Sequence, residues 1–259
     1  MDLNNIFNYL SIFNANSENW EKFVELNVKQ AGMFPKQIID LFEMMINYDF
    51  KIINIEQFEC NENTEKLSKS LRKNGSDKTH KHNYYILYSY IFDKLNKINP
   101  RILEIGIGTN NTQLISHMGK RGIPGASLRA WSEYFPNGEI FGADVDKNIL
   151  FQENNIRTTF VDQLDSSTFN QLYESFNSKQ FDVIIDDGLH SIGANFNTLI
   201  NTLDKINTNG YLIIEDINKC EDSYKLWKII DFMISHKKIY ETMFINSKRA
   251  YMYVIHKIK

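Results

Sequence analysis

Short apolar runs separated by amphipathic segments dominate the chain from residue 84 onward. Five runs rich in Ile, Val, Leu and Phe have the length and composition of buried strands: residues 101–105, 139–143, 157–161, 181–185 and 211–214. The segments around them have the apolar spacing of helices: 84–97, 127–135, 147–154, 166–176, 194–205 and 223–235. Strands that alternate with helices are typical of βαβ units and of a mostly parallel sheet.

The C-terminal end shows a different pattern, with two β-type runs around a short polar turn. Residues 241–245 and 250–256 flank the polar segment 246–249, which predicts an antiparallel hairpin. The fold class expected for the chain is therefore α/β. We predict a doubly wound, Rossmann-like sheet that is mostly parallel and is closed by a C-terminal antiparallel hairpin.

The N-terminal part is helical in pattern. Residues 20–28 carry an apolar stripe, and Pro35 is expected to open a second helix in which Ile38 and Phe42 repeat at helical spacing. The stretch 61–81 is polar and Lys-rich with a turn signal near its middle, and we interpret it as a hinge. The predicted division is a helical N-terminal cap over 1–75 and a Rossmann-like domain over 76–259.

Composition narrows the class of protein further. The 259 residues are 42% hydrophobic and 24% charged, as in an ordinary globular chain, and the net charge of -3 argues against a nucleic-acid partner. Two cysteines, Cys60 and Cys220, are too few for a disulfide framework or a zinc site. No run approaches a membrane span, and the start lacks the basic and apolar regions of a signal peptide, so we expect a cytoplasmic protein. The N-terminal cap carries more apolar side chains than a lone tail requires, so a homo-oligomer that pairs through the cap is one possibility.

Glycines and acids follow the first three predicted strands. Gly106 allows a tight turn against a ligand, but Asn111 replaces the third glycine of the dinucleotide fingerprint. Asp144, after the second strand, can hold a ribose diol, and Asp162, after the third, can reach an adenine amino group. Each acid alone also fits a helix cap or a solvated loop, whereas their succession favours a nucleoside ligand. Glu104, just before the glycine, favours a ligand with an ammonium group over a pyrophosphate.

This series resembles the motifs of class I S-adenosylmethionine-dependent methyltransferases over residues 77–259. The matching segments are Glu-Ile-Gly-Ile-Gly at 104–108, Gly-Ala-Asp at 142–144 and Val-Asp at 161–162. The resemblance implies that Gly106 lies by the methionine part of the cofactor, that Asp144 holds the ribose and that Ser127 meets the cofactor carboxylate. A plain helix-start role for Ser127 is the alternative, and Trp131 and Phe135 are expected in the core.

One departure from the family pattern is an insertion. Residues 109–124 separate the glycine loop from the Gly-Ala-Ser-Leu-Arg-Ala-Trp segment, whereas the two are almost contiguous in relatives. The insertion is interpreted as a lid or as a subunit contact, and the sequence does not choose between them.

The fourth and fifth strands each end in two adjacent acids. Asp186 and Asp187 follow one strand, and Glu215 and Asp216 follow the other. If the strands are neighbours, four carboxylates meet at the ligand-binding edge, where they repel one another unless they are protonated or bound to a cation. Oxygen ligands favour Mg²⁺ or Mn²⁺. His190 lies three residues beyond Asp187 and can accept a proton near neutral pH.

The combination of Asp-Asp-Gly-x-His with a later Ile-Glu-Asp is similar to metal-dependent sugar O-methyltransferases of the type that acts on macrolide-linked sugars. This resemblance implies that Asp187, Glu215 and Asp216 bind the metal and that His190 is the general base. It leaves Asp186 to face either the cofactor or the fold.

A further resemblance lies in residues 77–84, which match an Asp-Lys-x-x-x-His-x-Tyr stretch found before the first strand in relatives. It implies that Lys78, His82 and Tyr84 lie over the cofactor cleft and contact cofactor or substrate. The alternative is a polar helix start in which Tyr84 packs inward.

Together these features predict an S-adenosylmethionine-dependent O-methyltransferase that is assisted by Mg²⁺ or Mn²⁺. The expected acceptor is a hydroxyl of a sugar or of a glycan or capsule precursor, including sugar phosphates and sugar nucleotides. A nucleotide-dependent oxidoreductase is one alternative, but it would need the missing loop glycine and would not explain Glu215 and Asp216. A non-catalytic cofactor-binding protein of the same fold is another, and the intact acids and His190 argue against it.

Overall fold

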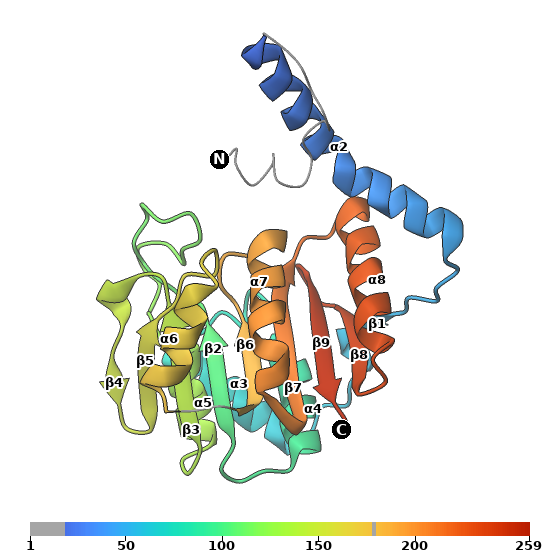
Figure 1. The fold of residues 1–259 in the computed structure, drawn as a ribbon. Coiled ribbons are helices and arrows are strands. Elements are labelled where there is room, and N and C mark those ends of the chain that lie inside the picture. The colour runs from blue at the N-terminus through green and yellow to red at the C-terminus, as the bar shows by residue number, and fades with distance from the viewer. Residues whose placement is uncertain (1–18, 178–179) are drawn as a thin grey trace. The chain divides into compact units, whose positions relative to one another are not determined.

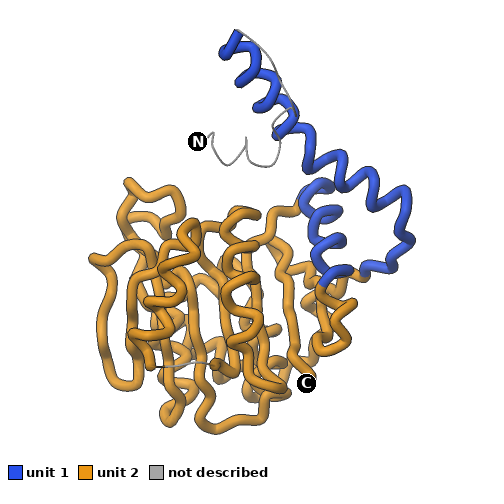
Figure 2. The backbone as a smooth tube through the Cα atoms, viewed as in Figure 1, with its two compact units in different colours: residues 1–50, 220–233 blue, residues 51–219, 234–259 orange. Residues whose placement is uncertain are grey.

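The computed structural model describes residues 19–177 and 180–259 (Figure 1). The chain forms two compact units, residues 1–50 with 220–233 and residues 51–219 with 234–259 (Figure 2). This division differs from the expected boundary at residue 75, and the division into a cap over 1–75 and a domain over 76–259 stays a prediction. The expectations for the first 18 residues, the chain start included, lie outside the described residues.

The larger unit contains a nine-stranded sheet in the order β1-β8-β9-β7-β6-β2-β3-β5-β4. The central strands β7, β6, β2, β3 and β5 pair in parallel, whereas β8 and β9 form an antiparallel hairpin that joins the sheet at β7. The strands are β1 Ile52–Asn54, β2 Arg101–Ile105, β3 Glu139–Asp144, β4 Gln152–Glu153, β5 Ile156–Phe160, β6 Phe181–Asp186, β7 Ile206–Ile217, β8 Tyr240–Asn246 and β9 Tyr251–Lys257. The predicted mostly parallel sheet with a terminal hairpin is confirmed.

Helices cover both faces of the sheet, as the doubly wound fold requires. Figure 1 shows α6 (Ser167–Ser175) and α7 (Ile192–Thr202) on one face, and α3 (Glu62–Asn74), α4 (Tyr84–Leu95) and α5 (Ala126–Tyr134) on the other. Trp131 and Phe135 are buried in the core, as expected. Among the described residues, no helix has both the length and the apolar character needed to cross a membrane.

The smaller unit is built from α2 (Trp20–Met45) and most of α8 (Glu221–Ser235). The Tyr48 hydroxyl donates to Asp231 at 2.6 Å, and the ring of Phe42 meets that of Phe232 edge-on. The expectation that Pro35 opens a helix was wrong, because α2 continues through it. Proline removes one backbone donor and is costly within a helix, but the flanking residues hold the rest of this long helix together.

The predicted hinge at 61–81 was also wrong over most of its length. Asn61 and Thr64 exchange side-chain and backbone hydrogen bonds in a capping box that starts α3, and Gly75 ends the helix with φ +82°. Leu67 and Leu71 are fully buried within the core. The Lys-rich composition is therefore the solvated face of an amphipathic helix.

The helix expected at 147–154 is replaced by shorter elements. Lys147–Ile149 forms a single 3-10 turn, and Gln152–Glu153 forms the edge strand β4, which pairs with β5. The side chain of Asp146 accepts the backbone N–H of Asn148 and so favours a tight turn over a continuing helix.

The register of the sheet brings the ends of the central strands together. Ile105 pairs with Asp186, and Asp186 pairs with Ile214. The residues that follow, Gly106, Asp187 and Glu215, therefore emerge side by side at the carboxyl edge.

The opposite edge is held by Asp182, whose side chain is almost completely buried. Its carboxylate accepts the backbone N–H of Arg101 at 2.8 Å, the ammonium of Lys97 at 2.6 Å and the amide of Asn207 at 2.7 Å. Since these donors lie at or just before the start of β2 and at the start of β7, Asp182 ties the beginnings of β2, β6 and β7 together.

We predict that Asp182→Ala lowers the free energy of unfolding by about 2 kcal/mol, because a buried backbone N–H loses its acceptor. Asp204→Ala is the matched control: its carboxylate is largely exposed and pairs with its neighbour Lys205, so its effect should stay within about 0.5 kcal/mol. Urea unfolding of both variants checks the prediction. Equal losses in the two variants would contradict it.

Candidate functional site

A cavity of about 640 Å³ opens at the carboxyl edge of the parallel strands. It is lined by residues at or just beyond the carboxyl ends of the five central strands, namely 105–109, 144–145, 161–164, 187–190 and 215–216. Side chains from 76–84, 114–118 and 126–127 complete the lining. Ligands of open α/β sheets bind at this edge, so the cavity is the candidate site.

Most of the residues expected from the sequence line this one cavity. They are Lys78, Tyr84, Gly106, Ser127, Asp144, Asp162, Asp187, His190, Glu215 and Asp216, and His82 lies with them. Glu104 and Asp186 do not line it: both are fully buried and bonded to other parts of the fold.

The glycine loop packs directly against the loop after β6. Gly106 has φ +87°, and a Cβ atom there would lie 2.2 Å from the backbone oxygen of Asp187. The Asp144 carboxylate accepts the backbone N–H groups of Ile107 and Asp146, each at 2.9 Å. Burial raises the pKa of Asp144, and these N–H groups oppose that rise. Asp144, which was expected to hold the ribose of a ligand, therefore also fixes the backbone of the glycine loop.

A buried ammonium lies among three carboxylates beneath the cavity. Lys78 Nζ is 2.7 Å from Asp187 Oδ2, 2.7 Å from Glu215 Oε2 and 3.5 Å from Glu104 Oε1, and only 2% of the side chain is exposed. Burial acts to lower the pKa of Lys78, but the three carboxylates outweigh it and hold this pKa well above its usual range. Lys78 was expected to contact cofactor or substrate, whereas its ammonium is bound by the protein's own acids.

Glu104 is held on two sides by helix α5. The Ser127 hydroxyl and the Trp131 indole N–H donate to its two oxygens, each at 2.7 Å. Burial raises the pKa of Glu104, and Lys78 opposes that rise. The Ser127 hydroxyl, which was expected to meet the cofactor carboxylate, thus donates to Glu104. The ammonium group near Glu104, which was expected to come from a ligand, is that of Lys78.

Two tyrosines of α4 bind the two acids near the end of β7. The Tyr88 hydroxyl donates to Glu215 and the Tyr84 hydroxyl donates to Asp216. Burial raises the pKa of Glu215 well above its usual range; Asp187 adds to the rise and Lys78 opposes it. Tyr84 is almost fully buried, in line with the inward-packing alternative, and its hydroxyl also reaches the site.

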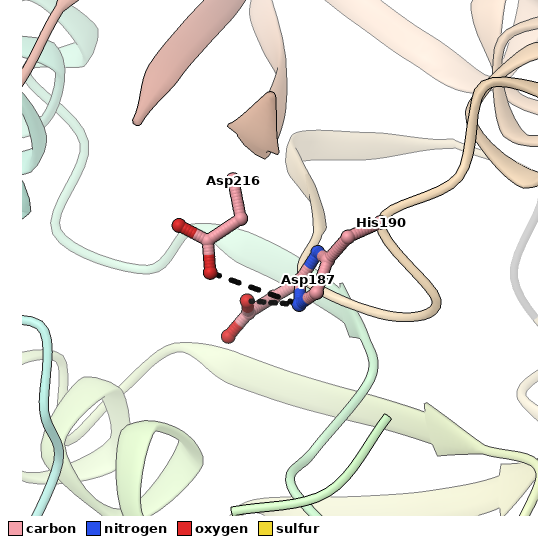
Figure 3. A group of neighbouring side chains, drawn as sticks. All are labelled: Asp187, His190 and Asp216. Carbon is pink, nitrogen blue, oxygen red and sulfur yellow. Dashed lines mark ion pairs between the residues drawn. The ribbon is translucent and has the colours of Figure 1, made fainter. Parts of the chain in front are cut away.

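Asp187, His190 and Asp216 form a cluster that faces the cavity (Figure 3). Each offers one ligand atom, and these atoms all lie within 4.8 Å of one another. His190 Nε2 is 3.8 Å from Asp187 Oδ1 and 3.7 Å from Asp216 Oδ2. Two carboxylates and an imidazole are ligands that divalent cations accept.

Backbone strain coincides with this cluster. His190 has φ +54° and Asp216 has φ +53°, in the left-handed region that residues with side chains seldom adopt. Such strain costs on the order of 1 kcal/mol or more per residue and persists only where the surroundings enforce it. The loop after β6 and the irregular end of β7, where the pairing with β9 shifts register, are therefore held in these shapes by their contacts.

Sequence reasoning missed two residues that shape the site. Gln163 follows the acid at the tip of β5, and its Nε2 donates to Asp186 Oδ1 at 2.7 Å, while Asn195 donates to the other oxygen at 3.1 Å. Asp186 thus faces the fold, one of its two expected roles. Ser116, in the insertion, donates to the backbone oxygen of Gly188. Only the position of Gln163 after a strand could have drawn attention to it.

The curated proteins that this chain resembles in sequence include O-methyltransferases that act on glycosides. No family model matches the chain. It is 30% identical over 146 residues to 8-demethyl-8-alpha-L-rhamnosyl tetracenomycin-C 2'-O-methyltransferase of Streptomyces olivaceus, a match that covers 56% of this chain and 36% of the relative. It is 34% identical over 118 residues to mycinamicin VI 2''-O-methyltransferase of Micromonospora griseorubida, a match that covers 45% of this chain and 27% of the relative.

Among solved structures, the chain resembles the MycE methyltransferase from the mycinamycin biosynthetic pathway in complex with Mg and SAH. The TM-score is 0.60 at 24% identity, over 74% of this chain and 54% of that chain. The chain spans about a third of the length of the curated relatives and about half of the solved one. The similarity confirms the methyltransferase fold, and the curated relatives confirm the expected resemblance to macrolide-type sugar O-methyltransferases.

Proposed function

We propose that the chain transfers a methyl group from S-adenosylmethionine to a hydroxyl of a sugar, with a divalent cation and with His190 as the base. The acceptor sugar belongs to a small glycoside or to a glycan or sugar-nucleotide precursor. The observation that carries this proposal is the shared cavity: the glycine loop and the cluster of Asp187, His190 and Asp216 line the same space. The relatives that modify rhamnosyl and macrolide glycosides support the class of acceptor.

The methyl donor is assigned to the side of the cavity formed by β2, β3 and β5. Gly106 keeps the loop backbone close to the ligand, Asp144 meets the ribose and Asp162 lies toward the adenine. The volume of about 640 Å³ falls within the usual range for a small-molecule site. SAH in the MycE structure supports the choice of donor.

The charges around Lys78 favour a divalent cation. When ionised, Glu104, Asp187, Glu215 and Asp216 leave three negative charges after Lys78 is counted. A divalent cation and the sulfonium of the donor carry three positive charges, which would balance them. Asp187 and Asp216 would hold the ion with Glu215 as the third carboxylate, and Mg²⁺ or Mn²⁺ suits these oxygens. A bound ion lowers the pKa of a substrate hydroxyl that contacts it.

His190 is assigned the proton transfer. Its Nε2 is 3.8 Å from Asp187 Oδ1 and 3.7 Å from Asp216 Oδ2, so the imidazole lies beside the carboxylates that would hold the ion, within reach of a hydroxyl bound there. The acceptor hydroxyl gives its proton to His190, its oxygen forms a bond to the methyl carbon, and the bond from that carbon to sulfur breaks. The sulfur leaves as a neutral thioether. The transfer requires the oxygen to lie in line with the breaking bond, and we assign this positioning to the cavity walls.

We predict that methyl transfer from labelled S-adenosylmethionine to sugar acceptors stops after chelation and returns with Mg²⁺. The test set contains rhamnosyl glycosides and sugar nucleotides, with a catechol as control. Full activity after chelation would reject the metal. Methylation of the catechol without any transfer to sugars would reject the acceptor class.

We predict that His190→Ala lowers kcat by about 10² to 10⁴, because the acceptor proton loses its base. The affinity for S-adenosylhomocysteine, measured by calorimetry, should stay within about twofold, since His190 is not assigned to the donor. His80→Ala, which changes an exposed histidine of the 76–84 segment that does not line the cavity, is the matched control. Near-normal turnover in His190→Ala would remove the base from the proposal.

A further inference from the structure

The peptide group between Gly188 and Leu189 forms a hydrogen bond with a side chain on each side. On one side the Ser116 hydroxyl donates to the Gly188 carbonyl at 2.8 Å. On the other side the Leu189 N–H donates to Gln163 Oε1, also at 2.8 Å. This peptide lies one residue before His190, so its orientation limits the positions that the histidine can take.

The amide of Gln163 is fixed in one orientation. Its Nε2 donates to Asp186 Oδ1 at 2.7 Å and to Thr198 Oγ1 at 2.9 Å, and the side chain is almost buried. Because a buried carboxylate can only accept and the Leu189 N–H can only donate, a flipped amide would lose both bonds. Gln163 therefore presents its oxygen to the loop.

Gly188 fits this arrangement for a steric reason. A Cβ atom at this position would lie 2.0 Å from Gln163 Oε1, so a side chain would push the amide away. The glycine lets the loop approach Gln163 closely, and the chain then turns through the left-handed conformation of His190. The strained residue thus comes one residue after a peptide that two side chains hold.

The insertion at 109–124 supplies Ser116, which binds the Gly188 carbonyl. The Thr109 hydroxyl donates to Asp146 Oδ2 at 2.6 Å, and the N–H of Met118 donates to the Thr109 carbonyl at 2.8 Å. These bonds tie the insertion to the end of β3 and hold Ser116 over the cavity. The segment that departs from the family pattern thereby contacts the loop that carries the histidine.

We infer that Ser116 and Gln163 are positioning residues that clamp the Gly188–Leu189 peptide and so direct the His190 imidazole toward Asp187 and Asp216. The inference rests on the proposed function, in which His190 accepts the proton. The insertion then has a role in the reaction, because the hydrogen bond from Ser116 to the Gly188 carbonyl holds His190 in the position where it can accept the proton.

The test compares wild type with Ser116→Ala, Ser116→Thr and Thr112→Ala in the full chain. Thr112→Ala is the matched control, because it removes a hydroxyl from an exposed residue of the insertion that does not line the cavity. Ser116→Ala should lower kcat about tenfold, while the Kd for S-adenosylhomocysteine and the KM for the donor stay within about twofold. Ser116→Thr keeps the hydroxyl and should restore most of the turnover.

Hydrogen exchange of the Leu189 amide gives a second measurement that does not depend on methyl transfer. It should be faster in Ser116→Ala than in wild type, and unchanged in Thr112→Ala. Unchanged kcat and unchanged exchange in Ser116→Ala would overturn the inference, and so would equal losses of kcat in Ser116→Ala and Thr112→Ala. If wild type methylates no sugar, the proposed function fails, and the exchange rates alone then decide whether the clamp exists.

Discussion

The ammonium of Lys78 is the interaction on which the site depends. It bridges Asp187 and Glu215 at 2.7 Å and lies 3.5 Å from Glu104, so acids from three strand ends share one buried positive charge. Removing one partner from such a group is costly, because the remaining charges stay buried without compensation. The segment before α4 must therefore dock on the sheet edge, and it closes the base of the cavity as it does so.

The same contact explains why the surrounding backbone tolerates strain. Tyr84 and Tyr88 hold Asp216 and Glu215 from α4, while Gly106 lets the glycine loop pack on the backbone of Asp187. Held from several directions, the loop after β6 and the end of β7 keep their left-handed residues and present two carboxylates and a histidine to one cavity. This preorganisation suits a reaction in which a hydroxyl, a base and a methyl carbon must meet in line.

Much of this architecture could be predicted from sequence, because the signals were local. Most of the central strands are rich in apolar residues, and the ends of parallel strands share an edge, so the acids at the ends of β6 and β7 were expected to meet. Helix α3 was missed because its Lys-rich composition hid the stripe of Leu67 and Leu71. The elements at 147–154 were missed because a short turn and an edge strand leave little periodic signal.

The contacts within the site were less predictable. Lys78 was singled out by resemblance, but its bonds to three carboxylates depend on distant segments that meet only in the folded chain. Ser116 and Gln163 lie in loops, where no periodicity marks them, and each acts through one backbone group of the loop after β6. The most direct test of the account is crystallographic: anomalous diffraction from crystals grown with Mn²⁺ and S-adenosylhomocysteine. The account predicts one Mn²⁺ peak in contact with Asp187 and Asp216, in the cavity that also holds the nucleoside. A nucleoside bound there with no peak at these carboxylates, or with a peak elsewhere, would contradict it.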